Sequence, residues 1–191
     1  MDAKVFAGFT TLRASPMKIE RDADIDQKIA TVWKHAAAAL ISIRQLPDDP
    51  VAALRRIKFD KIGMHPIEDR PLNLIEQVNQ TFTFLVALQA SKLLLQWHPE
   101  ITQLTLMPGA HAPKGSLDIE SHPAGLIGAE TFAAPPKSNQ KLKKDLEKLS
   151  LREEENRYIF FTSPEYSETV RQPQLENFGV IVWSVELPSI G

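Results

Sequence analysis

Apolar residues recur at three- and four-residue steps through the first half of the chain, which is the period of an amphipathic helix. This pattern predicts a helix from Asp24 to Leu46, closed by a Pro-Asp-Asp-Pro turn. A second, short helix is predicted over Val51 to Ile57, with Asp49 as its N-cap. Residues 58–72 contain glycine and prolines and are predicted to be an irregular connection.

A longer helix is predicted to begin at Asn73 and to run for about 24 residues. Glu76 lies three residues after Asn73, as in a capping box. The expected inner stripe of this helix comprises Ile75, Val78, Phe82, Leu85, Val86, Gln89, Leu93 and Trp97. Such a length suggests a central helix that lies across a sheet.

After Pro99 the period changes to short apolar runs that are typical of strands. Gly128 and Ala129 are small and would let another group approach the chain closely. Strands are predicted at 101–107, 117–120, 126–133, 157–162 and 179–187, with a weak candidate at 5–9. Helices are predicted over the stripe Leu142, Leu146 and Leu149 and from Ser163 to about Arg171.

The resulting order predicts an α/β protein: a helix, a three-strand meander, a helix, a strand, a helix and a strand. We expect residues 73–191 to form this core and residues 1–72 to form an N-terminal helical extension packed on it. A chain of 191 residues favours one domain.

The net charge and the cysteine content limit the classes of function and the kinds of site that the chain can have. The net charge of −2 means that a nucleic-acid partner would have to meet a local basic patch. The absence of cysteine excludes disulfides, zinc-thiolate sites and a cysteine nucleophile. Residues 1–15 lack the features of a signal peptide, and no apolar run is long enough to span a bilayer, so we expect a cytoplasmic protein and no membrane partner.

Carboxylates inside predicted strands are the strongest chemical signal in the chain. Asp118 and Glu120 share one face of a strand, and Glu130 lies in the next strand, between Gly128 and Phe132. A buried carboxylate costs several kcal/mol unless it is paired or holds a metal. If the two strands form a hairpin, Asp118 and Glu130 can converge, and Mg²⁺ would offset their repulsion.

The element order, with Asp in the second strand and Glu in the third, resembles the PD-(D/E)xK nuclease superfamily, the restriction-endonuclease-like fold. The resemblance covers roughly residues 73–187. It implies a nuclease that hydrolyses phosphodiester bonds in DNA or RNA with Mg²⁺ or Mn²⁺. Asp118, Glu130 and the main-chain carbonyl of Thr131 would be the metal ligands, with Glu120 and Glu76 assisting.

The chain departs from this family at Phe132, where members usually have lysine. Some families of this superfamily supply the lysine from the following helix. Lys141 is the best replacement because it flanks the apolar stripe, whereas Lys137 and Lys144 are weaker candidates. The lysines of this helix would also place positive charge beside the acids, where a phosphate backbone would lie.

Each signal also has a structural explanation. Glu76 can be an ordinary capping residue, the strand acids can lie at a solvated sheet edge, and the lysines can form a solvated helix face. His122, in the turn beside the acids, could assist the site but fits a solvated turn better.

Two other functions therefore remain open. One is a catalytically inactive nuclease-fold protein that binds nucleic acid or protein. The other is a self-associating structural protein, a homodimer that uses the helix from Asp24 to Leu46.

Overall fold

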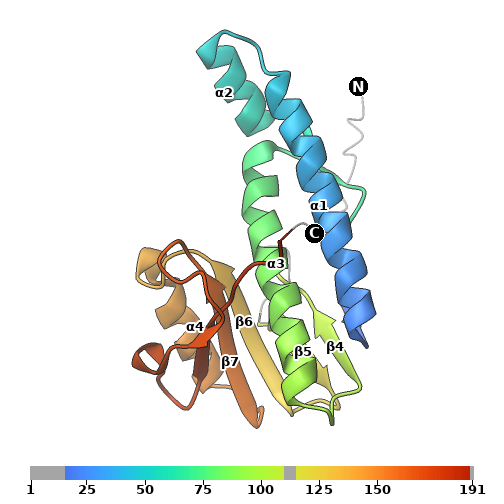
Figure 1. The fold of residues 1–191 in the computed structure, drawn as a ribbon. Coiled ribbons are helices and arrows are strands. Elements are labelled where there is room, and N and C mark those ends of the chain that lie inside the picture. The colour runs from blue at the N-terminus through green and yellow to red at the C-terminus, as the bar shows by residue number, and fades with distance from the viewer. Residues whose placement is uncertain (1–15, 110–114, 190–191) are drawn as a thin grey trace, which may run out of the picture.

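Seven strands form one mixed sheet, in the order β1-β4-β5-β6-β7-β9-β8, in a computed structural model that describes residues 16–109 and 115–189 (Figure 1). Strands β4, β5 and β6 form an antiparallel meander, and β7 and β9 continue the sheet parallel to β6. The strand bounds are β1 Met17–Ile19, β4 Gln103–Leu106, β5 Ile119–His122, β6 Ile127–Ala133, β7 Asn156–Thr162, β8 Val170–Arg171 and β9 Ile181–Ser184.

Helices cover both faces of the sheet, which is therefore a mixed α/β arrangement. Helix α3 (Leu74–Trp97) packs on one face against β6 and β7. Helix α4 (Lys141–Ser150) connects the parallel strands β6 and β7 and packs on the opposite face. A short 3-10 helix, Ser138–Gln140, leads into α4.

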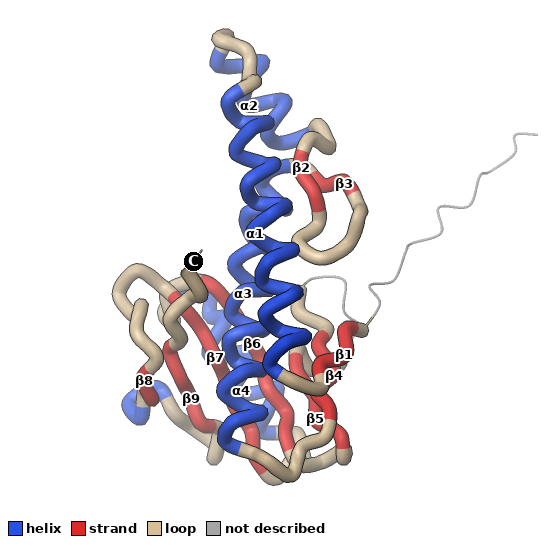
Figure 2. The backbone as a smooth tube through the Cα atoms, turned by 45° about the vertical axis from the view of Figure 1, so that its right-hand side comes forward, coloured by secondary structure: helices blue, strands red, loops and turns tan. Residues whose placement is uncertain are grey.

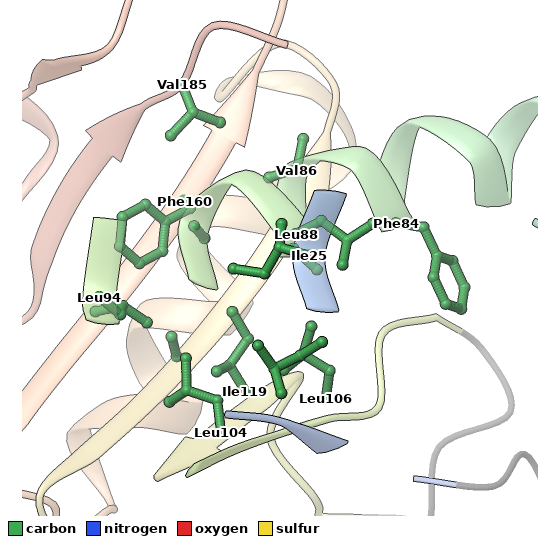
Figure 3. Packing of buried hydrophobic residues seen from close by; sticks show 14 of the residues in the cluster. Ile25, Phe84, Val86, Leu88, Leu94, Leu104, Leu106, Ile119, Phe160 and Val185 are labelled. Atoms are coloured by element: carbon green, nitrogen blue, oxygen red, sulfur yellow. The ribbon is translucent and has the colours of Figure 1, made fainter. Parts of the chain in front are cut away.

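Each face of the sheet has its own apolar core. On the α3 side, Leu88 and Leu94 pack over Leu104, Leu106 and Ile119 of the meander (Figure 3). On the α4 side, the smaller core consists of Leu117, Phe132, Leu142, Leu146, Leu149, Ile159, Phe161, Val180 and Val182. Because both faces of β6 and β7 are covered, these strands are almost continuously buried.

The chain segment of residues 36–82 projects beyond one end of the sheet, and we call it the helical arm (Figures 1 and 2). Its last residue, Phe82, lies at the sheet, where it lines a cavity with Ala133 and Thr162. The arm contains the second half of α1 (Asp22–Arg44), all of α2 (Pro50–Phe59) and the first half of α3. A small two-stranded sheet, β2 (Gly63–Met64) with β3 (Pro71–Leu72), lies against α1 and α3. The first half of α1 packs beside α3 over the main sheet, and β1 extends that sheet at one edge.

The predicted helix starts are confirmed by their caps. The Asp49 side chain accepts a hydrogen bond from the Ala52 N–H at 2.7 Å, and the Asn73 side chain accepts one from the Glu76 N–H at 2.8 Å. Both bonds satisfy N–H groups that a first helical turn leaves unpaired.

The helix predicted from Ser163 to Arg171 is wrong. Ser163 and Tyr166 close a tight turn through two backbone hydrogen bonds, and the chain then forms β8 at the sheet edge. Tertiary contacts hold this segment extended, because the Ser184 hydroxyl bonds to the carbonyls of Glu168 and Val170. The last helix of the predicted core is therefore replaced by a turn, an edge strand and the 3-10 helix Pro173–Leu175.

Two details of the strands also differ from the prediction. Strand β1 was not predicted, and the weak candidate at residues 5–9 lies outside the described residues. The second strand of the meander begins at Ile119 rather than at Leu117. Just before this strand begins, the Asp118 carboxylate, rather than a main-chain carbonyl of β5, accepts the hydrogen bond of the Thr131 N–H in β6.

Candidate functional site

Asp118 and Glu130 lie at the junction of β5 and β6. Ile119 pairs with Ala129 and Glu120 with Gly128, so the same antiparallel register carried one step further sets Asp118 opposite Glu130. Both side chains are buried, and both line a cavity of about 400 Å³. The cavity is also lined by Thr83 of α3 and by Ser116.

The Asp118 carboxylate is held by Thr131. Its Oδ2 accepts hydrogen bonds from the Thr131 N–H at 2.8 Å and from the Thr131 hydroxyl at 2.9 Å. Burial raises the pKa of Asp118, although these two hydrogen bonds oppose the rise. The Thr131 N–H points to the β5 side of β6, and the carbonyl of the same strand residue points to that side as well.

Two lysines from α4 reach the Glu130 carboxylate. Lys148 Nζ lies 2.6 Å from Glu130 Oε1 and 2.6 Å from the Ser116 carbonyl oxygen. Lys141 Nζ lies 3.8 Å from Glu130 Oε2 and 2.7 Å from Asp145 Oδ1. Residues 141, 145 and 148 fall on one face of the helix because they follow its three- and four-residue steps.

The cluster contains one more acid than base: Asp118, Glu130 and Asp145 against Lys141 and Lys148. Burial, and then the charge of Asp118, raise the pKa of Glu130 to about 7, against the opposing effect of Lys148. Burial likewise raises the pKa of Asp145, and its Oδ2 is buried without a hydrogen-bond partner among the described residues. The two lysines therefore do not fully compensate the acids.

Lys141 remains a cation in this environment. Burial lowers the pKa of its ammonium group, but the charge and hydrogen bond of Asp145, with further help from Glu130, raise it by more. Its side chain is 39% exposed, so it is accessible from outside.

The donor set fits a hard divalent cation. Two carboxylates and a main-chain carbonyl are oxygen ligands, and Mg²⁺ commonly uses one or two carboxylates and completes its shell with water and substrate phosphate. No group of three or more His, Cys, Asp or Glu that could hold a metal is present in residues 16–109 and 115–189. A metal here would thus depend on Asp118, Glu130 and Thr131.

The other predicted site residues lie outside the cavity lining. Glu120 is two residues from Asp118 and lies 3.5 Å from Arg152 Nη2. Glu76 is exposed in the first turn of α3, seven residues and about 10 Å of helix before Thr83. His122, Lys137 and Lys144 are exposed.

Phe132 and Gly128 have structural roles. The Phe132 ring stacks on Phe161, with centroids 5.3 Å apart, in the core between the sheet and α4. A Cβ at Gly128 would lie 2.5 Å from Leu117 Cδ1 and 3.1 Å from the Glu154 side chain. The group that approaches Gly128 closely is therefore part of this chain.

The sequence interpretation missed Asp145 and Lys148. Each of Lys141, Asp145 and Lys148 directly precedes a leucine of the buried stripe. The argument that selected Lys141 therefore applied equally to Lys148, and the same position beside the stripe marked Asp145 as a residue turned toward the sheet. The carbonyl of Ser116 had no sequence signal, because its role depends on where α4 docks.

A second cavity, of about 940 Å³, lies at the carboxyl ends of β6, β7 and β9. It is lined by Ala133, Ser163 and Leu187 among others, and its two acids, Glu168 and Glu186, are exposed. Although it is larger, none of the described residues that line it is a buried ionisable group, so we place the candidate chemistry in the Asp118–Glu130 cavity.

Comparisons with protein-family models, with curated proteins and with solved structures gave no match. None of the helices in the described part of the chain is both long and apolar enough to cross a membrane.

Proposed function

We propose that this protein is a metal-dependent phosphodiesterase that acts on nucleic acid, with a core of the PD-(D/E)xK type. The supporting observation is the placement of Asp118 opposite Glu130 in one cavity that α4 supplies with lysine. The order α3, β4-β5-β6 meander, α4 and parallel β7 agrees with the same family.

In this proposal Asp118, Glu130 and the Thr131 carbonyl hold Mg²⁺ or Mn²⁺. Such an ion would polarise a phosphate and lower the pKa of a bound water. Thr131 fixes the Asp118 carboxylate through two hydrogen bonds, so that carboxylate has little freedom to reorient.

The two lysines have different roles in this proposal. Lys148 is bound to both the Glu130 carboxylate and the Ser116 carbonyl, so it positions Glu130. Lys141 is more exposed and stabilises the charge that develops on the phosphate. The exposed Lys137, Lys143 and Lys144 on the same segment would contact the backbone phosphates.

The test is cleavage of plasmid and single-stranded DNA with Mg²⁺ or Mn²⁺. We expect Asp118→Asn and Lys141→Met to abolish cleavage, and Lys58→Met, at an exposed position of α2 outside the proposed site, to retain it. Circular dichroism melting of each variant separates lost chemistry from lost folding. Equal cleavage by the wild type and Asp118→Asn would refute the catalytic proposal.

One observation favours a second candidate, a catalytically inactive binding module. The Lys148 ammonium already lies 2.6 Å from two oxygens, as a bound cation would. Titration calorimetry with Mn²⁺ separates the two proposals. An active site takes up Mn²⁺ stoichiometrically and loses it in Glu130→Gln, whereas a lysine-filled site takes up none.

A further inference from the structure

In the helical arm, the residues of α3 that are buried and those that are exposed are the reverse of what the sequence predicts. In the first half of that helix Gln77 and Thr81 are buried, at 1% and 7% exposure, whereas Val78 and Phe82 are 48% and 44% exposed. The predicted inner stripe is therefore wrong for its first half. An apolar stripe at helical spacing that the described part of the chain leaves uncovered indicates another binding surface.

Polar contacts fix which side of the arm the chain covers. Gln77 Nε2 donates to the His35 carbonyl, and Gln77 Oε1 accepts from the Met64 N–H, each at 2.9 Å. His35 Nδ1 in turn lies 2.7 Å from the His65 carbonyl oxygen. These bonds hold β2 and β3 against one side of α1 and α3 (Figure 2).

A groove runs between α1 and α3 where the arm is uncovered. Its cavity of about 230 Å³ is lined mostly by apolar side chains, including Ala36, Leu40 and Ile43 from α1 and Val78 and Phe82 from α3. Ile75 continues the α3 stripe, and α2 adds Val51 and Leu54 to the arm with no buried residue of its own.

The exposed apolar area matches that of a stable interface. Nine of the thirteen exposed large apolar residues in the described chain lie between residues 40 and 82. Eight of them are 42% to 66% exposed: Leu40, Ile41, Ile43, Val51, Leu54, Ile75, Val78 and Phe82. At roughly 200 Å² for a fully exposed large residue, they present about 860 Å². A standard interface buries about 800 Å² on each partner.

The charge of the arm favours a second copy of this chain as the occupant. Residues 36–82 contain six basic and six acidic side chains, so two arms meet without net repulsion and a polyanion is not attracted. Each copy brings the same pair of antiparallel helices, and a two-fold axis lets two pairs close into a four-helix bundle.

We infer that the chain forms a homodimer through the α1–α3 groove of the helical arm. This inference does not depend on the proposed phosphodiesterase activity. Light scattering of the wild-type protein between about 1 and about 100 µM, a range that covers moderate affinities, tests it directly. We expect twice the chain mass of 21.4 kDa.

The interface variant is Leu40→Glu combined with Val78→Glu, both at exposed positions. It should halve the mass at an unchanged circular dichroism spectrum. The matched control is Leu151→Glu, because Leu151 is 85% exposed and lies outside the arm. A monomeric wild type, or a dimer that persists in the double variant, would overturn the inference.

Cross-linking tests the interface independently. Because the chain has no cysteine, a single cysteine can be introduced at a chosen position. A bifunctional thiol reagent should link Val78→Cys into dimers and leave Leu151→Cys monomeric. Equal cross-linking of both variants would also contradict the arm as the interface.

Discussion

Lys148 Nζ lies 2.6 Å from Glu130 Oε1, which joins helix α4 to the central strand β6 by an ion pair. The Glu130 side chain is 4% exposed and that of Lys148 is 33% exposed, so the pair is only partly screened by water. This contact determines how much negative charge the cavity keeps, and it bears on both stability and metal binding.

Removal of this ammonium should destabilise the protein. We expect Lys148→Met to lower the free energy of unfolding by about 1–3 kcal/mol at neutral pH, because Glu130 loses its closest cation. Lys143→Met is the control. The Lys143 side chain is 72% exposed, and its ion pair with Glu147 is long, at 3.9 Å, so its removal should change the free energy of unfolding by less than about 0.5 kcal/mol. Urea unfolding measures both, and equal effects would contradict the buried pair.

The raised pKa of Glu130 predicts a pH dependence of stability. Its pKa is about 7 in the folded protein against an ordinary value of 4.5, so the folded state binds this proton more tightly than the unfolded state. This stabilisation is complete below about pH 4.5 and is lost as the pH rises through about 7.

The variant Glu130→Gln isolates the contribution of Glu130 to the pH dependence of stability, because glutamine does not titrate. The free energy of unfolding of the wild type, relative to Glu130→Gln, should fall by on the order of 3 kcal/mol between about pH 4.5 and about pH 8. Urea titrations at a series of pH values give this difference. A difference that does not change with pH would show that Glu130 titrates normally.

Placing at position 132 the lysine that PD-(D/E)xK nucleases usually have there should damage the protein rather than activate it. Phe132 is 4% exposed and stacks on Phe161, so Phe132→Lys removes ring packing and buries a charge. We expect a loss of more than about 3 kcal/mol of stability and no gain in cleavage. Phe132→Leu, which keeps the site apolar, is the control. Faster cleavage by a stably folded Phe132→Lys protein would instead show that the position can serve catalysis.

Local patterns in the sequence predicted most of the elements. Helices α1 and α3 were evident from their period, and the caps at Asp49 and Asn73 fixed where α2 and α3 begin. Such signals act over a few residues and need no distant partner. The segment after Ser163 was predicted wrongly because the extended form depends on Ser184, more than a dozen residues away.

The candidate site was predicted in part for the same reason. Two-residue spacing put Glu130 and Phe132 on one face of β6, and the hairpin brought Asp118 opposite Glu130. Glu76 was suggested by the family resemblance and Glu120 by its place on the same strand face as Asp118, but the cavity is not lined by either. Lys148 precedes a leucine of the buried stripe just as Lys141 does, but its contacts with Ser116 and Glu130 could be recognised only from the docking of α4.

The sequence by itself determined helices α1 to α4, the strand acids and the apolar residues available to bury. Only the tertiary structure decided which of these are actually buried. Hydrophobic periodicity predicts that one face of a helix will be covered, but it does not indicate which element covers it. In the arm, the hydrogen bonds of Gln77 orient α3 so that Val78 and Phe82 face outward. In the site, likewise, the unequal count of acids and lysines follows from the way α4 packs on the sheet.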